Sequence, residues 1–329
     1  MKFSIIIVSY SYRRINYLRK ALTALKNQTY KNIEIILVLN GFDDNLKDFS
    51  EEWLNLDYRN KLLTFSENYD LKNDNVNIGK YRYRKGIEIS SGDYIFCQSD
   101  DDFVSEDFFE KMFNIFNNNR ECQTALGLPV DYFWDNGKYT KPKKGLWFNR
   151  STYIHGKKLF LEWIKNKDLI INPGFCYVIK RELLLKHIQT IWYGYDFSIF
   201  MTIVPCGITG FDKTALMYWG RHQAQENNRA NINHYENFIY IKPSIIRNKY
   251  ALRNWNSQKS KLSDIKKLKK FQQDQLTFFS THGFYYNFKK LKFKNCMYHI
   301  LNIKSKNIFI KILSLEIKRD FIKLFKLIF

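Results

Sequence analysis

The sequence of 329 residues lacks most of the features that restrain a chain covalently or place it across a membrane. Its five cysteines are scattered and form no Cys-x-x-Cys pair, which argues against a disulfide framework or a zinc site and fits a reducing cytoplasm. No run of 18 uninterrupted apolar residues occurs, so we expect no membrane-spanning helix. Proline and glycine are too sparse for a flexible linker. The first residues have the pattern of a strand, so no signal peptide is expected.

Acidic residues are scarce toward the C-terminus. From Tyr240 to Phe329, 21 lysines and arginines accompany only four acids, so this segment carries +17 of the net charge of +21. Residues 307–329 place large apolar side chains at helical intervals of three and four, with lysines mostly on the other side. A basic amphipathic helix of this kind can lie on an anionic membrane surface. An ordinary helix that packs its apolar stripe on the rest of the protein is the alternative.

Nucleic-acid binding is a competing explanation of the basic segment, because basic patches with interleaved aromatic residues do bind nucleic acid. However, the segment alternates lysine with large aliphatic residues, lacks Arg- and Gly-rich sequence, and matches no recognition motif. We therefore expect an anionic membrane surface as a partner, and no nucleic acid.

Short apolar runs alternate with amphipathic segments over the first hundred residues. This alternation is typical of an α/β fold, in which parallel strands are joined by right-handed crossovers and ligands bind at the carboxyl ends of the strands. The pattern predicts strands at residues 4–9, 33–39, 62–65 and 94–97, and helices at 16–26 and 80–89.

The pattern changes after residue 103. Residues 107–116, 181–187 and 196–204 have helical patterns, residues 121–132, 174–179 and 208–219 have strand patterns, and residues 133–156 read as a loop. The sequence from about residue 236 onward is helical in pattern. We expect two halves of one domain at 1–105 and 106–235, followed by a basic helical region at 236–329.

Three consecutive carboxylates, Asp100, Asp101 and Asp102, follow the strand predicted at residues 94–97. Because adjacent negative charges repel one another, this arrangement favours a bound cation. Hard oxygen ligands suit Mg²⁺ or Mn²⁺, and substrate phosphates often complete the coordination of such ions. The alternative is a solvated acidic turn before a helix.

A series of short motifs surrounds these carboxylates. In order and spacing, over roughly residues 3–105 and more thinly to about 228, the chain resembles family 2 glycosyltransferases. This resemblance implies a GT-A fold, an inverting mechanism, a nucleotide-sugar donor and a metal ion, Mn²⁺ or Mg²⁺, bound by an Asp-x-Asp motif. It is carried by residues 4–11, Gln28-Thr29-Tyr30, residues 34–41, Asn77-Ile78-Gly79, Arg84-Lys85-Gly86, Gly92-Asp93-Tyr94-Ile95 and Asp100-Asp101-Asp102.

The resemblance also implies roles for individual residues. The residues implied in nucleotide-sugar binding are Val8, Tyr10, Asn40, Arg84, Asp100 and Arg221, and those implied in metal binding are Asp101, Asp102 and His222, which lies in a late segment that resembles Tyr-Arg-x-His. Three of these residues have an alternative role: Tyr10 as a packed aromatic, Arg84 as a surface cation and His222 as a structural residue.

An inverting transfer needs a base that takes the proton of the acceptor hydroxyl. The family usually supplies it from a Glu-Asp pair, and here the corresponding segment contains Tyr195-Asp196. Asp196 is the only carboxylate between Glu182 and Asp212, so it is the candidate base, with a helix N-cap as its alternative role.

Together these features predict a cytoplasmic enzyme held peripherally at the inner face of the cell membrane. It would transfer a sugar from a UDP-sugar to a lipid-linked or surface-polysaccharide acceptor. One alternative is a nucleotide-sugar-binding protein without turnover, because Leu39, Ser99 and Tyr195 stand where the family has carboxylates. The other is a basic membrane or nucleic-acid adaptor on the same fold.

Overall fold

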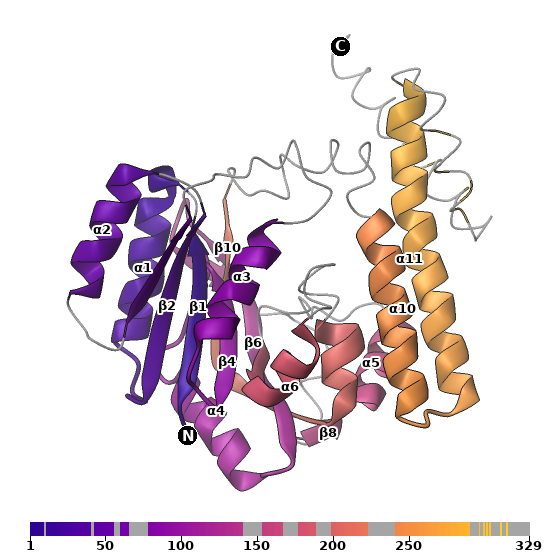
Figure 1. Cartoon of the computed structure of the whole chain (residues 1–329), viewed down its shortest axis with the longest axis horizontal. Coiled ribbons are helices and arrows are strands. Elements are labelled where there is room, and N and C mark those ends of the chain that lie inside the picture. Colours follow the sequence, from indigo (N-terminus) through magenta and orange to yellow (C-terminus); the bar gives the residue numbers. More distant parts are fainter. Residues whose placement is uncertain are drawn as a thin grey trace. The chain divides into compact units, whose positions relative to one another are not determined.

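The computed structural model describes residues 1–9, 11–40, 43–55, 60–65, 78–140, 153–166, 177–188, 199–222 and 241–289, and the single residues Cys296, His299, Leu301, Ile303, Ile310 and Ser314. Two compact units, Met1–His222 and Gln223–Phe329, make up the chain and are described separately. The first is an α/β domain around one sheet (Figure 1), and the described part of the second is helical. The domain boundaries expected after residues 105 and 235 stay predictions.

The described strands of the first unit form one sheet of ten strands. Its order is β3-β2-β1-β4-β9-β6-β10-β5, with β7 paired to β6 and β8 to β10. The long ladders, β1 with β2 and β4, β2 with β3, and β6 with β10, are parallel, whereas the shorter strands pair antiparallel. This confirms the predicted α/β class with a mostly parallel sheet. The strands are β1 Phe3–Ser9, β2 Ile33–Asn40, β3 Lys61–Phe65, β4 Tyr94–Ser99, β5 Phe103–Val104, β6 Cys122–Phe133, β7 Lys138–Thr140, β8 Tyr153–His155, β9 Tyr177–Lys180 and β10 Ile208–Arg221.

Helices cover both faces of β1 and β2, and for that reason every residue of β1 is buried. The helices α1 (Ile15–Lys26) and α2 (Asp44–Leu54) lie on one face and α3 (Ile78–Ile89) on the other (Figure 1). α3 approaches the sheet closely at Gly86, where an added Cβ would lie 2.5 Å from Ile6 Cγ2. The glycine therefore permits this close packing of helix on sheet.

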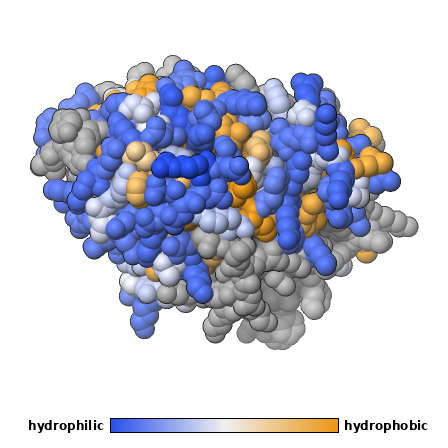
Figure 2. Space-filling model, turned by 90° about the horizontal axis from the view of Figure 1, so that it is seen from below, coloured by the Kyte–Doolittle hydropathy of each residue, from blue (hydrophilic) through white to orange (hydrophobic). Residues whose placement is uncertain are grey.

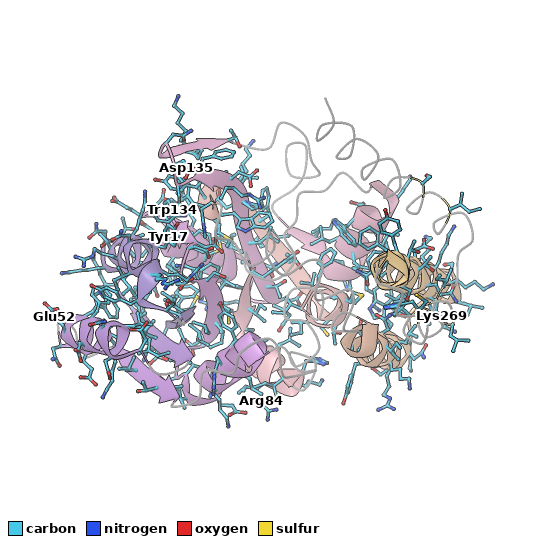
Figure 3. All side chains as sticks on the ribbon, turned by 90° about the horizontal axis from the view of Figure 1, so that it is seen from above. Tyr17, Glu52, Arg84, Trp134, Asp135 and Lys269 are labelled. Carbon is cyan, nitrogen blue, oxygen red and sulfur yellow. The ribbon has the colours of Figure 1, made fainter. Side chains whose placement is uncertain are left out.

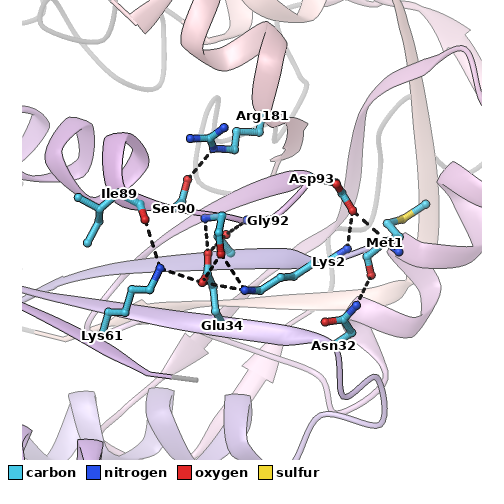
Figure 4. Close-up of polar contacts among 12 residues, drawn as sticks. Met1, Lys2, Asn32, Glu34, Lys61, Ile89, Ser90, Gly92, Asp93 and Arg181 are labelled. Carbon is cyan, nitrogen blue, oxygen red and sulfur yellow. Dashed lines mark hydrogen bonds and ion pairs between the residues drawn. The ribbon is translucent and has the colours of Figure 1, made fainter. Parts of the chain in front are cut away.

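Buried Glu34 ties the amino ends of the first strands together (Figure 4). Its carboxylate accepts hydrogen bonds from Ser4 Oγ at 2.5 Å, from the Ser91 amide at 2.6 Å and from Lys2 Nζ at 3.0 Å, and Lys61 Nζ lies at 3.2 Å. Burial opposes ionisation, but these donors outweigh it and lower the pKa of Glu34 to about 2. Ionised Glu34 therefore holds the amino ends of these strands together, at the edge of the sheet opposite their carboxyl ends.

The two longest strands, β6 and β10, form the second half of the sheet. α4 (Phe108–Asn118) packs on both, and it buries five apolar side chains. The register of β10 against β6 shifts between Asp212 and Leu216, which marks a bulge. The other described elements of this half are α5 (Gly156–Asn166), α6 (Arg181–Lys186), the π-helix η3 (Ile199–Ile203) and the 3₁₀ turn η4 (Val204–Cys206).

Most strands and helices begin or end within a few residues of their predicted positions. The prediction of a loop at 133–156 is wrong in part, because β7 and β8 lie within it. Strands of three residues are too short to show a period in the sequence. Helices α2 and α5 were not predicted, and residues 174–176 and 196–198 of two predicted elements lie outside the described residues.

The described part of the second unit contains two long helices, α10 (Ile241–Ser257) and α11 (Leu262–Lys289), which pack together. This agrees with the helical pattern predicted from residue 236 onward. The amphipathic helix predicted at 307–329 lies outside the described residues, apart from Ile310 and Ser314. No described helix is long and apolar enough to cross a bilayer. Hydrophilic residues predominate on the face drawn in Figure 2.

Candidate active site

The three consecutive carboxylates lie directly after β4, at the carboxyl end of the sheet. Asp100, Asp101 and Asp102 are 2%, 9% and 3% exposed. This burial excludes the alternative of a solvated acidic turn. Burying three carboxylates is costly unless each has donors or a counter-ion, so their partners define the chemistry of the site.

Asp100 is held by Ser9 and Arg14. Ser9 Oγ, at the end of β1, donates to Asp100 Oδ2 at 2.7 Å. Arg14 Nε lies 2.9 Å from each oxygen of Asp100, and Nη2 lies 2.5 Å from Oδ1. Arg14 is itself buried, in the turn η1 (Tyr12–Arg14) that joins β1 to α1. Both oxygens of Asp100 therefore accept hydrogen bonds from the protein.

Asp101 receives contacts from two distant segments. Arg14 Nη2 lies 3.0 Å from Asp101 Oδ2, and His222 Nε2 lies 2.9 Å from the same oxygen. The imidazole of His222 is buried, and its Nδ1 has no hydrogen-bond partner among the described residues. The end of β10 and the end of β4 thus meet at one carboxylate oxygen.

Asp102 is held by backbone. Its Oδ1 accepts a hydrogen bond from the Gly220 amide at 2.9 Å, and its carbonyl accepts one from Gln98 Nε2 at 2.8 Å. At Gly220 an added Cβ would lie 2.2 Å from the Asp101 carbonyl oxygen and 2.5 Å from Trp134 Nε1. Glycine is required there because β10 passes so close to the carboxylates.

The three carboxylates differ in acidity. Burial raises the pKa of Asp102 well above its ordinary value, and the charge of Asp101 adds to this against the hydrogen bond from Gly220. Burial also raises the pKa of Asp100, although Arg14 opposes it. At Asp101 burial acts in the same direction, but the hydrogen bond from His222 and the charge of Arg14 outweigh it and lower the pKa. Asp101 is therefore the carboxylate that ionises most readily.

Aromatic rings support Asp101 and His222. The ring of Tyr17, from α1, lies 4.5 Å from the rings of both His222 and Trp134, measured between centroids. Trp134 Nε1 donates to the Asp101 carbonyl oxygen at 3.2 Å. Figure 3 shows Tyr17 and Trp134 lying together. This packing fixes the orientation of His222 toward Asp101.

The side chains at this edge include donor types that bind divalent cations. Asp101 Oδ2 and His222 Nε2 are hydrogen-bonded to each other at 2.9 Å, and a carboxylate oxygen and an imidazole nitrogen can both bind such an ion once that hydrogen bond is given up. Among the described residues no group of three or more His, Cys, Asp or Glu side chains is arranged as a metal site. Asp101 and His222 are thus two candidate ligands among the described residues, and an ion held by them would need further ligands, such as phosphate oxygens.

The other described residues predicted to bind the nucleotide-sugar lie at several places in the fold. Val8 is buried within β1, and Asn40 ends β2. Arg84 pairs with Glu88 at 2.7 Å on α3, well separated from Tyr17 and Trp134 (Figure 3). Arg221 is the last residue of β10 and precedes His222, but its Nε pairs with Asp131 at 2.6 Å and its guanidinium covers the Trp219 ring. Tyr10 and Asp196 lie outside the described residues.

Among the residues that bond the three carboxylates, Ser9, Arg14 and Gly220 were not predicted. Ser9 and Arg14 flank the first strand-to-helix connection, which faces the ends of the neighbouring strands in any such fold. An Arg-Arg pair at this connection was therefore a usable signal for a counter-ion. Nothing in the sequence around Gly220 indicates its contact with Asp102.

Residues 4–187 match the sequence model of the protein family Glycosyl transferase family 2. EpsH of Bacillus subtilis is 36% identical over 101 residues, which are 31% of this chain and 27% of EpsH. An uncharacterized glycosyltransferase of Rickettsia typhi is 25% identical over 226 residues, which are 67% of this chain and 64% of that protein. The chain thus spans less than two thirds of the length of either relative.

Solved structures show the same fold. S. aureus TarS 1-349, in complex with UDP-GlcNAc, superposes with a TM-score of 0.54 at 14% sequence identity, over 86% of this chain and 81% of the TarS chain. This likeness confirms the expected GT-A type of fold.

Proposed function

The chain belongs to glycosyltransferase family 2, and we propose that it transfers a sugar, with inversion, from a UDP-linked donor to a hydroxyl of a lipid-linked or surface-polysaccharide acceptor. One observation carries this proposal. The buried carboxylate of Asp101, two residues after β4, meets His222, the residue after β10, at 2.9 Å, and we infer that a nucleotide diphosphate and its cation are held there. TarS, which shares the fold, has been crystallised with UDP-GlcNAc and with UDP, and this supports a UDP-sugar as the donor.

The reaction requires one base and one leaving group. The acceptor oxygen forms a bond to the anomeric carbon while the bond from that carbon to the diphosphate oxygen breaks, and UDP leaves with the electron pair. The acceptor proton passes to a carboxylate, and we assign this role to Asp196. The assignment rests on the family resemblance and on the lack of any other carboxylate between Glu182 and Asp212 in the sequence.

Asp101 and His222 would hold Mn²⁺ or Mg²⁺, with Asp102 in support. When bound, such an ion supplies positive charge against the leaving diphosphate. We keep Val8, Tyr10, Asn40 and Asp100 as nucleotide-sugar residues. We keep Arg84 and Arg221 with them, and in the structure the Nε of each pairs with a carboxylate, Glu88 and Asp131 respectively.

A donor panel tests this function. Release of UDP from a series of UDP-sugars is measured with Mn²⁺ for the wild type, Asp101→Asn and Asp196→Asn, with Glu121→Gln as the control because Glu121 is an exposed carboxylate outside the site. We expect turnover with at least one donor, a loss of about 100-fold or more in both site variants, and no change in the control. Wild-type turnover in both variants contradicts the site, and binding of a UDP-sugar without any turnover supports the non-catalytic alternative.

We further propose that the second unit binds an anionic membrane surface. Its two helices expose a cluster of cations, and Leu262, 69% exposed, lies among them at the start of α11. Cations near an anionic surface contribute about 1 kcal/mol each, and an exposed apolar side chain can enter the interface. We call this cluster the basic hairpin, and it comprises Lys249, Arg253, Lys259, Lys261, Lys266, Lys267, Lys269 and Lys270.

Vesicle flotation tests the membrane proposal with the full chain. We expect binding to phosphatidylglycerol vesicles and none to phosphatidylcholine vesicles, with weaker binding when Lys259, Lys261 and Lys266 are all replaced by glutamine. Salt-dependent binding to DNA without any response to anionic vesicles contradicts the proposal and favours nucleic acid.

A further inference from the structure

Arg14 is the cation that the protein itself places on the acidic cluster. The turn before α1 fixes its backbone, because the Arg14 amide donates to the Ser11 carbonyl at 3.0 Å and the Arg13 amide donates to Ser11 Oγ at 3.3 Å. Its side chain is only 10% exposed. A guanidinium held in this way is part of the site and not a surface charge.

The contacts of Arg14 are divided unequally between two carboxylates. Nε and Nη2 make three hydrogen bonds to Asp100, at 2.5 to 2.9 Å, whereas Nη2 forms an ion pair with Asp101 Oδ2 at 3.0 Å. A planar guanidinium can keep its paired bonds to one carboxylate while it gives up a contact to another. Arg14 can therefore stay with Asp100 and release Asp101.

The contact that Arg14 can release is the one to Asp101 Oδ2. This oxygen contacts Arg14 Nη2 on one side and His222 Nε2 on the other. A divalent cation held by Asp101 and His222 must compete with the positive charge of Arg14 for this oxygen, and like charges so close together repel each other.

We propose that Arg14 is a resident counter-ion that stabilises the buried carboxylates in the unliganded protein and that makes binding of a divalent cation depend on the nucleotide diphosphate. The negative charge of a diphosphate offsets the repulsion between Arg14 and the second cation. Binding of the ion by the empty protein is therefore weak, and the ion and the diphosphate bind cooperatively. This inference rests on the proposed function, since it assumes that the site takes a metal–diphosphate pair.

The experiment measures Mn²⁺ binding from the electron paramagnetic resonance signal of free Mn²⁺, with and without UDP. Arg14→Met removes the charge but keeps a side chain of similar length. Arg14→Lys keeps the charge but cannot make the paired hydrogen bonds of a guanidinium. Arg13→Met is the matched control, because the neighbouring Arg13 is exposed and its loss changes the net charge by the same amount. Binding of Mn²⁺ is followed for all four proteins, so no readout depends on activity.

We expect the wild type and Arg13→Met to bind Mn²⁺ weakly alone and at least tenfold more tightly with UDP. Arg14→Met should bind Mn²⁺ alone at least tenfold more tightly than the wild type, and UDP should add less. If Arg14→Met does not fold, Arg14→Gln takes its place, because it also removes the charge: tighter Mn²⁺ binding than in the wild type supports the proposal, and equal or weaker binding overturns it. Arg14→Lys keeps the charge and should bind Mn²⁺ alone as weakly as the wild type; binding as tight as in the uncharged variant would overturn the role of the charge.

Two negative results have different meanings. If the wild type binds Mn²⁺ with UDP but Arg14→Met gains nothing alone, only the role of Arg14 is overturned. If neither protein binds Mn²⁺ even with UDP, the metal-dependent function falls and the role of Arg14 falls with it.

Discussion

His222 Nε2 lies 2.9 Å from Asp101 Oδ2, although the two residues are 121 positions apart in the chain. The contact joins the end of β10 to the residue that follows β4 by two positions. It brings together two segments that only the completed sheet can place side by side. Changes that disturb either strand end should therefore act on the site.

Two substitutions of His222 distinguish its proposed role in binding the metal ion from the packing of its ring. His222→Phe keeps a ring against Tyr17, whose centroid lies 4.5 Å away, but removes the nitrogen next to Asp101. We expect the Mn²⁺-dependent gain in UDP affinity to fall by about 10-fold or more, as with the loss of other groups that bind or orient a metal. His222→Ala, which also removes the ring, should lower the melting temperature further. Unchanged Mn²⁺ dependence in His222→Phe would make this histidine purely structural.

Gly220→Ala should damage the site through the backbone. The new Cβ would lie 2.2 Å from the Asp101 carbonyl oxygen and 2.5 Å from Trp134 Nε1, so β10 must move away from Asp101 and Asp102. Overpacking of this kind costs about 1–3 kcal/mol, and UDP release should fall together with stability. Urea denaturation and the UDP assay measure the two effects.

A second glycine serves as the control for this substitution. Gly137 has a φ of +68°, and the nearest atom to an added Cβ is Tyr132 Oη at 3.6 Å. Gly137→Asn should be tolerated, because asparagine accepts this backbone conformation. Equal loss of activity in both variants would remove the special role of Gly220.

The Glu34 network predicts a pH dependence of stability. Because the pKa of Glu34 is lowered from 4.5 to about 2 in the folded protein, its ionised form contributes stability above pH 4.5. This contribution, at most about 3 kcal/mol, is lost as the pH falls toward 2. Glu34→Gln should therefore lower the free energy of unfolding at pH 7 and should differ little from the wild type near pH 2.

Chemical denaturation at several pH values measures this difference. Exposed Glu121→Gln is the matched control and should change stability little at any pH. A destabilisation by Glu34→Gln that stays constant from pH 7 to pH 2.5 would show that the hydrogen-bonding shape of the side chain matters and its charge does not.

The buried strands could be predicted because each is a nearly continuous apolar run. The burial of all seven residues of β1 is the physical reason for such a run. The carboxylates after β4 could also be located, since the end of a parallel strand is where ligands gather. Helix α2 was missed because the polar residues of 44–54 mask its short apolar stripe.

Partners of site residues could not be predicted, because side chains from different segments meet only in the folded sheet. Arg14 is the clearest case, since its role depends on distances to Asp100 and Asp101, 86 and 87 positions later. Arg221, in contrast, was predicted to belong to the site and pairs with another residue. It neighbours His222 in sequence, but it is the last residue of β10 and its Nε pairs with Asp131 of β6 instead of the carboxylates.

Calorimetric titration of UDP into the protein, with Mn²⁺ or with a chelator, tests most directly the claim that Asp101 supports a metal–diphosphate pair. The account predicts that Mn²⁺ tightens UDP binding at least tenfold in the wild type and leaves it unchanged in Asp101→Asn. Equal UDP affinity with and without Mn²⁺ in the wild type, or an undiminished Mn²⁺ effect in Asp101→Asn, would contradict it.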